Sequence, residues 1–459
     1  MGGVNKGLGN PPPGANLAAL RDHNAALVLG LLRDAGAAGA SRAELAGRTG
    51  LTPQAVSKIC ARLRAAGLAA EAGRRASTGG KPATTWRLVP DAAHAIGLHL
   101  DRDALTATLV DLTGTPVATR TAPLAFGAGA EALLDAVAKE VAALLADAEG
   151  CAAGGPTAGT SPSAVRGTAA ASPSGAPGSR ALAADAREGS SAAAGELAAG
   201  GAAHAVPSSP RASGTAHRPL LGVGVAVPGP LDHASGVLHR VTGFPEWDGF
   251  PLRDALAERL GMPVVVDKDT NAAALGLVLR GAGGGAPAAD SFAYLHLGTG
   301  LGAGLVLGGG VHRGARTGAG EFGHQVLQLD GPPCPCGNRG CIEALCLDAV
   351  AAGGTARAAR LLGVGAANLV RLLDIDLVLL GGRTVLAEPE PYLRGVRAVL
   401  TEDAGRADGR TVPVAVTPGG GRTVVEGAAE LALAPLFGRS GTAFTTRSDE
   451  TKIVTSGGM

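Results

Sequence analysis

The chain has 459 residues, enough for two or three domains, and a formal net charge of only +1. Hydrophobic residues make up 46% of it but aromatic residues only 2%, and its 73 glycines and 29 prolines indicate many turns. Residues 1–16 lack the apolar core of a secretory signal, and no window has the length and apolarity of a membrane span. We therefore expect a cytoplasmic protein with a disordered N-terminus, and exclude a membrane function.

Residues 17–90 carry the signals of a winged helix-turn-helix. Ser41 and Glu44 have the spacing of a capping box, and Thr52 followed by Pro53 suits the N-cap and first position of another helix. The predicted elements are a helix at 26–32, a helix at 42–49, a helix at 54–66, a polar hairpin tip at 74–82 and a strand at 84–89. This order predicts a helix-turn-helix followed by a basic wing.

Charge supports a DNA-binding role for the same region. It contains eleven basic and four acidic residues, a local charge of +7 within a nearly neutral chain, and such a patch attracts phosphates. The candidate DNA contacts lie at the third helix and the wing: Thr52, Gln54, Ser57, Lys58, Arg62, Arg74, Arg75 and Lys81. Side chains on the third helix would face the major groove, and those of the wing the backbone or minor groove. The alternative is a small helical domain with a solvated basic face.

The rest of the chain alternates strands and helices, with one interruption. Predicted strands lie at 95–100, 104–111, 221–227, 263–266, 291–297, 303–307 and 375–380, and predicted helices at 130–148 and 271–279. Residues 151–217 are so rich in Ala, Gly, Ser and Pro that we expect a disordered insert, and residues 438–459 a flexible tail. The pattern predicts a two-lobed α/β domain formed by residues 91–150 and 218–437.

A cluster of three cysteines is the most informative local feature. Cys334, Cys336 and Cys341 lie within eight residues, and His324 lies ten residues upstream. Three thiolates and one imidazole are a ligand set for tetrahedral zinc, and clustered thiols in a cytosolic protein are more often metal ligands than disulfides. We expect a structural Zn²⁺ site, flanked by the carboxylates of Glu321 and Glu343. A coincidental cluster is the alternative.

The run Cys-Pro-Cys-Gly-Asn-Arg-Gly-Cys-Ile-Glu at 334–343, after Ala-Gly-Glu-Phe-Gly-His at 319–324, resembles the ROK family of repressors, open reading frames and sugar kinases. The resemblance is closest to its winged-helix transcriptional regulators and covers about 17–150 and 218–437. It implies an actin-like, ribonuclease H-like fold of the sugar-kinase type, usually dimeric. It also implies zinc at His324 and the three clustered cysteines.

By the same resemblance, the sugar hydroxyls would contact Asp269, Glu321, His324 and Glu343. Carboxylates accept hydrogen bonds from vicinal hydroxyls, and a metal-anchored loop would hold them in place before the ligand arrives. For Glu321 and Glu343, orienting their neighbours is the alternative role. The family's usual Asn before the Asp is Lys268 here, which could pair with Asp269 or could contact an anionic sugar acid or sugar phosphate.

The first phosphate loop bears on catalysis. Kinases of the family carry Asp-x-Gly-Gly-Thr on the first hairpin, where this chain has His99-Leu100-Asp101-Arg102-Asp103, while Gly298 to Gly302 resembles the second phosphate loop. Glycines allow backbone N–H groups to approach phosphates, and two carboxylates would repel ATP. We therefore expect no catalytic residue, with Asp269 a vestigial general base.

The sequence predicts a sugar-responsive, DNA-binding transcriptional regulator, a repressor of carbohydrate genes, rather than an enzyme. Its expected partners are a double-stranded DNA operator, a small sugar or sugar-derived effector, and a second copy of itself. The alternatives are an ATP-dependent sugar kinase with an accessory DNA-binding domain, and a constitutive DNA-binding protein whose sugar pocket has decayed. The sequence does not name the sugar or the operator, nor the sign of the response.

Overall fold

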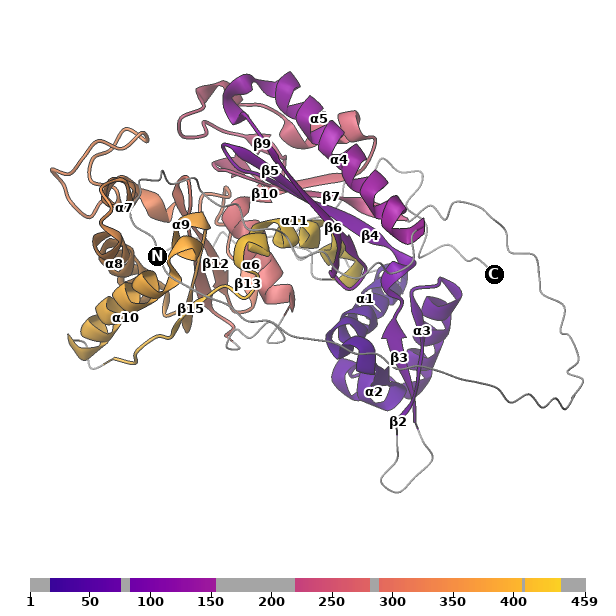
Figure 1. Ribbon diagram of the computed structural model, residues 1–459. Helices are drawn as coiled ribbons and strands as arrows, with labels where there is room; N and C mark the ends of the chain where they lie inside the picture. Colours follow the sequence, from indigo (N-terminus) through magenta and orange to yellow (C-terminus); the bar gives the residue numbers. More distant parts are fainter. Residues whose placement is uncertain (1–16, 76–82, 154–218, 281–288, 407–408, 439–459) are drawn as a thin grey trace, which may run out of the picture. The chain divides into compact units, whose positions relative to one another are not determined.

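The computed structural model describes residues 17–75, 83–153, 219–280, 289–406 and 409–438 (Figure 1). The chain divides into one unit of 1–153 with 218–459 and a second unit of 154–217. Residues 1–16, the insert after residue 153 and the tail after residue 438 lie outside the described part, as do Lys81 and the side chains of Arg74 and Arg75. In the described part, no helix is long and apolar enough to cross a membrane.

The N-terminal part contains three helices and a three-stranded antiparallel sheet. They are α1 (Leu17–Ala35), α2 (Arg42–Thr49), α3 (Pro53–Ala65), β1 (Ala40–Ser41), β2 (Ala69–Arg75) and β3 (Ala83–Leu88), with strand order β1-β3-β2. The predicted capping box is present, since the Glu44 N–H donates to Ser41 Oγ at 3.2 Å and the Ser41 N–H donates to Glu44 at 2.7 Å. Thr52 caps α3, with Pro53 in its first turn. These elements have the order predicted for a winged helix.

A five-stranded sheet forms the first lobe, in the order β10-β7-β4-β5-β6. Its strands are β4 (His94–Leu100), β5 (Ala104–Asp111), β6 (Pro116–Pro123), β7 (Leu220–Val227) and β10 (Val264–Lys268). The first three pair antiparallel, and β7 and β10 join in parallel. Helices α4 (Ala130–Ala153) and α5 (Leu252–Leu260) lie along one face (Figure 1).

The second lobe repeats this strand order in the sheet β13-β12-β11-β14-β15. Its strands are β11 (Phe292–Leu297), β12 (Leu301–Leu307), β13 (Gly310–Val311), β14 (Leu377–Gly381) and β15 (Val414–Val416). Its helices are α7 (Ile342–Ala351), α8 (Thr355–Leu373), α9 (Arg383–Ala387) and α10 (Pro389–Arg406). The repeated arrangement confirms the predicted two-lobed α/β architecture.

Two helices, α6 (Asp269–Arg280) and α11 (Thr423–Leu433), pack against each other between the two sheets. Small residues allow this close approach. A Cβ added to Gly276 of α6 would lie 2.8 Å from Gly427 Cα, and one added to Gly224 of β7 would lie 1.8 Å from the Ala428 carbonyl oxygen. Both distances are below van der Waals contact, so these glycines are required where helix meets helix and helix meets sheet.

The N-terminal part shares a hydrophobic core with α11. Val28, Leu29 and Leu32 of α1 belong to the same buried cluster as Leu433 and Phe437. At the edge of this cluster, Arg33 forms an ion pair with the fully buried Glu430 of α11. Helix α1 of the N-terminal part is therefore joined to α11, the helix that packs against α6.

Candidate functional site

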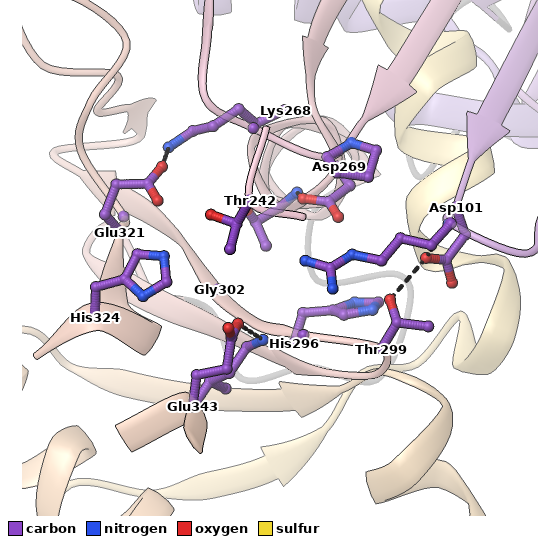
Figure 2. Close-up of a pocket in the computed structure, with 17 residues that line it drawn as sticks. Asp101, Thr242, Lys268, Asp269, His296, Thr299, Gly302, Glu321, His324 and Glu343 are labelled. Atoms are coloured by element: carbon purple, nitrogen blue, oxygen red, sulfur yellow. Dashed lines mark hydrogen bonds and ion pairs between the residues drawn. The ribbon is translucent and has the colours of Figure 1, made fainter. Parts of the chain in front are cut away.

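One polar pocket brings together the residues that the sequence selected for sugar binding. Lys268, Asp269, Glu321, His324 and Glu343 all line it, although they come from separate parts of the chain. Figure 2 shows their side chains around a common space. Residues of the first lobe and of the β11–β12 turn complete the lining: Asp101, Arg102, Thr242, His296, Thr299, Gly300 and Gly302.

Asp269 reaches the pocket because it is the first residue of α6, directly after β10. Its carboxylate accepts the Thr270 N–H at 2.6 Å at the N-terminal end of the helix. The preceding Asp267, which is fully buried, fixes this corner by accepting hydrogen bonds from Lys268 N–H at 2.8 Å and Asn271 Nδ2 at 2.9 Å. Arg313 Nε donates to the other oxygen of Asp267 at 2.8 Å. No motif marks Asp267, and its charged partner Arg313 comes from a distant segment.

Lys268 pairs with Glu321, which answers the question that the sequence left open. Its Nζ donates to Glu321 Oε1 at 3.0 Å and to the Ala319 carbonyl at 2.5 Å, and the side chain is only 3% exposed. The partner of Lys268 is thus Glu321 and not Asp269, which was one of the two alternatives. Because both hydrogen bonds are internal and the ammonium is buried, Lys268 orients Glu321 and does not present its charge to a ligand.

Glu343 is held by the backbone of the opposite turn. This buried residue lies in the first turn of α7, and its Oε2 accepts the Leu301 N–H at 2.8 Å. A Cβ added to Gly300 would lie 2.9 Å from the same oxygen, so glycine is needed for the turn to approach the carboxylate. Glu343 and Asp269 thus present fixed acceptors from two different helices.

The predicted metal ligands form a compact cluster. One ligand atom from each of His324, Cys334, Cys336 and Cys341 lies within 4.8 Å of all the others. Cys334 Sγ is 3.8 Å from His324 Nδ1, and Cys336 Sγ is 3.7 Å from Cys341 Sγ. Two sulfur ligands about 2.3 Å from one tetrahedral ion are about 3.8 Å apart, so the arrangement fits a single metal ion.

The chemistry of the donor set also fits a cation. Burial and the neighbouring thiols raise the pKa of Cys341 to about 12, so the protein itself does little to stabilise its thiolate. A bound cation would supply the missing positive charge. Cys341 is the N-cap of α7, and His324 ends the short 3-10 helix Phe322–His324 that follows Glu321. A metal here would therefore fix the two elements that carry Glu321 and Glu343.

The β4–β5 turn, where a kinase of this type would bind phosphate, is tied to the second lobe. Asp101 accepts hydrogen bonds from its neighbour's backbone N–H at 2.7 Å and from Thr299 Oγ1 at 2.9 Å (Figure 2). Asp103 pairs with Arg383 of α9 at 2.8 Å. Burial alone would raise the pKa of Asp101, but the backbone N–H, His99 and Thr299 lower it overall. A backbone donor of the turn is thus already engaged by a carboxylate.

One pocket residue, His296, escaped sequence reasoning because no motif marks it. His296 of β11 lines the pocket and shares a hydrogen bond of 2.8 Å between its Nδ1 and the Tyr294 hydroxyl. Burial lowers the pKa of the neighbouring His99, and the carboxylates of Asp269 and Asp101 offset this only in part. The position of His296 two residues before the Gly-Thr-Gly turn at 298–300 is the sequence signal that could have suggested it.

Only some of the side chains predicted to contact DNA are exposed on the same face of α3. Gln54 and Lys58 are exposed one turn apart on α3, whereas Ser57 and Arg62 are half-buried. The Ser57 hydroxyl donates to the Pro53 carbonyl at 2.8 Å, and the Thr52 hydroxyl is engaged in the helix cap.

Two arginines that were not selected line a groove beside this surface. Arg64 of α3 lies 3.5 Å from Glu71, and the guanidinium of Arg42 lies 5.5 Å above the Trp86 ring. Only the folded arrangement of α2, α3 and the sheet places them together.

Residues 211–351, which contain Asp269 and the whole metal cluster, match the family model described as ROK family. The chain contains a ROK family domain. Over 125 residues it is 41% identical to a glucokinase of Halalkalibacterium halodurans, a match covering 27% of this chain and 37% of that protein. Over 214 residues it is 29% identical to a putative xylose repressor of a Caldicellulosiruptor species, covering 38% of this chain and 53% of that protein. The chain thus spans about a third to a half of the length of these curated relatives.

The fold of the ROK domain and its N-terminal extension also occurs in a solved structure. A ROK family transcriptional regulator, described as a homologue of the E. coli MLC protein, aligns with a TM-score of 0.64 at 18% identity. The alignment covers 92% of this chain and 98% of that one, so it shows the fold. The relatives of the ROK domain include both a kinase and a repressor, so the choice between these activities depends on the residues of this chain.

Proposed function

We propose that this protein is a sugar-responsive, DNA-binding transcriptional regulator, a repressor of carbohydrate genes without phosphotransferase activity. The observation that carries the proposal is the state of the β4–β5 turn. Asp101 accepts the turn's own N–H and the Thr299 hydroxyl, while Asp103 is paired with Arg383. A phosphate loop must instead offer free N–H groups, and carboxylates at this position repel a triphosphate.

The pocket is suited to a sugar even without catalysis. Asp269 and Glu343 offer carboxylate oxygens to hydroxyl groups, and Lys268 holds Glu321 in a fixed orientation. His324 lies at both the pocket and the metal cluster. We propose that the cluster binds structural Zn²⁺, which when bound would hold these acceptors in place and so reduce the entropy lost on sugar binding.

The N-terminal part would bind the operator. Gln54 and Lys58 are exposed on α3 in a region of net charge +7, and Arg64 and Arg42 extend the basic surface. A homodimer would place two such surfaces on successive half-sites of a duplex. Sugar binding would change operator affinity because the ligand binds one arrangement of the lobes more tightly than another.

Footprinting of the full-length chain on genomic DNA, with and without glucose and xylose, tests this function. We expect specific protected sites whose occupancy changes when sugar is added. Lys58→Ala should weaken binding and reduce the salt dependence of affinity by about one unit of slope, whereas the remote surface variant Arg410→Met should not. Protection that no sugar changes would indicate a constitutive DNA-binding protein, and no specific protection would refute the proposal.

A sugar kinase remains the second candidate, since the 41% identity to a glucokinase is the highest of the matches reported above. Asp269 stands at the start of α6, where it could accept a hydroxyl proton from a sugar. Incubation with ATP, Mg²⁺ and glucose distinguishes the two candidates. Turnover that disappears in Asp269→Asn would establish the kinase, and we expect none above the level of that variant.

A further inference from the structure

Arg102 is the cation of the sugar pocket whose charge is not matched by a carboxylate. Among the described residues, Lys268 pairs with Glu321, Arg313 with Asp267 and Arg383 with Asp103. The guanidinium of Arg102 lines the same pocket but has no ion pair within the described chain. A half-buried guanidinium without a counter-ion is unfavourable unless another group offsets its lost hydration.

The backbone and ring contacts of Arg102 hold it at the mouth of the pocket. Its N–H donates to Asp101 Oδ1 at 2.7 Å, and its carbonyl accepts the Phe126 N–H at 3.3 Å. Its guanidinium lies 6.0 Å from the centroid of the Phe244 ring, at the limit of a cation–π contact. Both backbone polar groups of Arg102 are thus engaged, and its side chain lines the pocket beside the Phe244 ring.

The guanidinium converges with Glu343 on one point of the pocket. A methyl group placed on Gly300 would lie 3.4 Å from Arg102 Nη2 and 2.9 Å from Glu343 Oε2. Asp269 lines the same pocket. A sugar whose hydroxyl groups met the carboxylates of Glu343 and Asp269 would therefore carry its next substituent towards Arg102.

We propose that the ligand is a sugar bearing an anionic group, a phosphate or a carboxylate, which Arg102 binds while the acids of the pocket bind its hydroxyl groups. This inference rests on the proposed sugar-sensing function and specifies the ligand class of the same site. A guanidinium matches either oxyanion with paired N–H donors, which makes arginine well suited to this contact. Lys268, the cation that the sequence offered as one alternative for this role, is buried and its charge is balanced by Glu321.

The carboxylates that line the pocket repel an anionic ligand less than their number suggests, because each of them is already balanced by a contact within the protein. Glu321 is neutralised by Lys268, Glu343 is stabilised by the Leu301 N–H, and Asp101 is stabilised by Thr299. The acids therefore act as fixed hydroxyl acceptors, and the uncompensated positive charge is concentrated at Arg102. A free anion without hydroxyl groups would contact Arg102 but would make no hydrogen bonds from hydroxyl groups to the carboxylates.

Calorimetric titration of the full-length chain tests the inference with glucose, xylose, glucose 6-phosphate, glucuronate and inorganic phosphate. We expect one of the two anionic sugars to bind about 10- to 100-fold more tightly than the neutral sugars, and inorganic phosphate to bind more weakly than that sugar. Stronger binding of glucose 6-phosphate identifies a phosphate ligand, and stronger binding of glucuronate a carboxylate ligand. Arg102→Met should remove the preference by lowering the affinity for the anionic sugar more than the affinity for glucose. Arg102→Lys should retain part of the preference, and the control Arg360→Met on exposed α8 should retain all of it.

The outcomes separate this inference from the proposed function. Equal or tighter binding of neutral sugars, or a preference that survives Arg102→Met, refutes the anionic ligand but leaves a sugar sensor. Binding by none of the five probes refutes both the ligand class and the sensing role of the pocket. Operator binding is measured separately, with and without the preferred sugar, and its absence under both conditions would refute the regulator and not the subsite.

Discussion

Removing one partner of the buried ion pair between Arg33 and Glu430 should destabilise the protein more than removing one partner of an exposed pair. Arg33 Nη1 donates to Glu430 Oε2 at 2.8 Å, a second bond joins Nη2 to the other oxygen, and Nε donates to the Thr113 carbonyl at 3.0 Å. The side chains are 9% and 0% exposed. Burial lowers the pKa of Arg33, but Glu430, together with Asp34 and Asp111, raises it overall, so the guanidinium stays charged.

Glu430→Leu should lower the free energy of unfolding by about 3–5 kcal/mol, because it leaves a buried guanidinium without its counter-ion. The double variant Arg33→Met with Glu430→Leu should recover much of this loss, since both charges are then removed. Arg410→Met breaks an exposed pair of 2.7 Å with Asp376 and should cost less than about 1 kcal/mol. Urea denaturation followed by tryptophan fluorescence measures all three variants.

The same variants test whether this contact links the pocket to the N-terminal part. Helix α6 begins with Asp269 at the pocket and ends with Arg280, whose Nε lies 3.9 Å from Glu430. We expect Glu430→Leu to reduce the effect of sugar on operator affinity, with sugar binding itself nearly unchanged. If Glu430→Leu costs no more stability than Arg410→Met, or if the double variant is no more stable than the single one, the reasoning from burial is wrong.

Four further predictions follow from single contacts. Cys336→Ser should reduce metal affinity at least about 10-fold, measured by competition with a chelator, and an unchanged affinity would exclude this cluster as the metal site. Gly224→Ala should lower the free energy of unfolding by about 3 kcal/mol or more, because the added Cβ would overlap the backbone of α11. Gly405→Ala, where the added Cβ meets open space on α10, should instead raise the free energy of unfolding by about 0.5–1 kcal/mol. Ser41→Ala should cost about 0.5–2 kcal/mol by removing the cap of α2, and a neutral result in urea denaturation would contradict the capping role. Folding lowers the pKa of His99, so below about pH 6.5 the unfolded chain binds more protons than the folded one. The free energy of unfolding should therefore decrease as the pH falls below this value, and it should decrease less in His99→Asn.

Local patterns predicted most of the secondary structure. The capping box at Ser41 and the Thr52-Pro53 start of α3 follow from neighbouring residues alone, and both appear in the structure. The metal cluster was also predictable, because Cys334, Cys336 and Cys341 are close in sequence and so must be close in space. Alternating strands and helices likewise predicted the two lobes, although the predicted bounds differ by a few residues from those observed.

The sequence by itself determined the α/β fold, the predicted ligand set of the His/Cys cluster and the acids of the pocket. These depend on short-range spacing and on residue types, such as Cys, His, Asp and Glu, that have few chemical roles. Only the tertiary structure decided how the charges are paired. Lys268 could have met Asp269 next to it in sequence but meets Glu321, 53 residues away, and Asp101 meets Thr299, 198 residues away. Such pairs depend on the packing of distant segments around α6 and α11, which the order of residues does not reveal. The same packing leaves Arg102 without a carboxylate partner, and so gives the pocket its one uncompensated positive charge among the described residues.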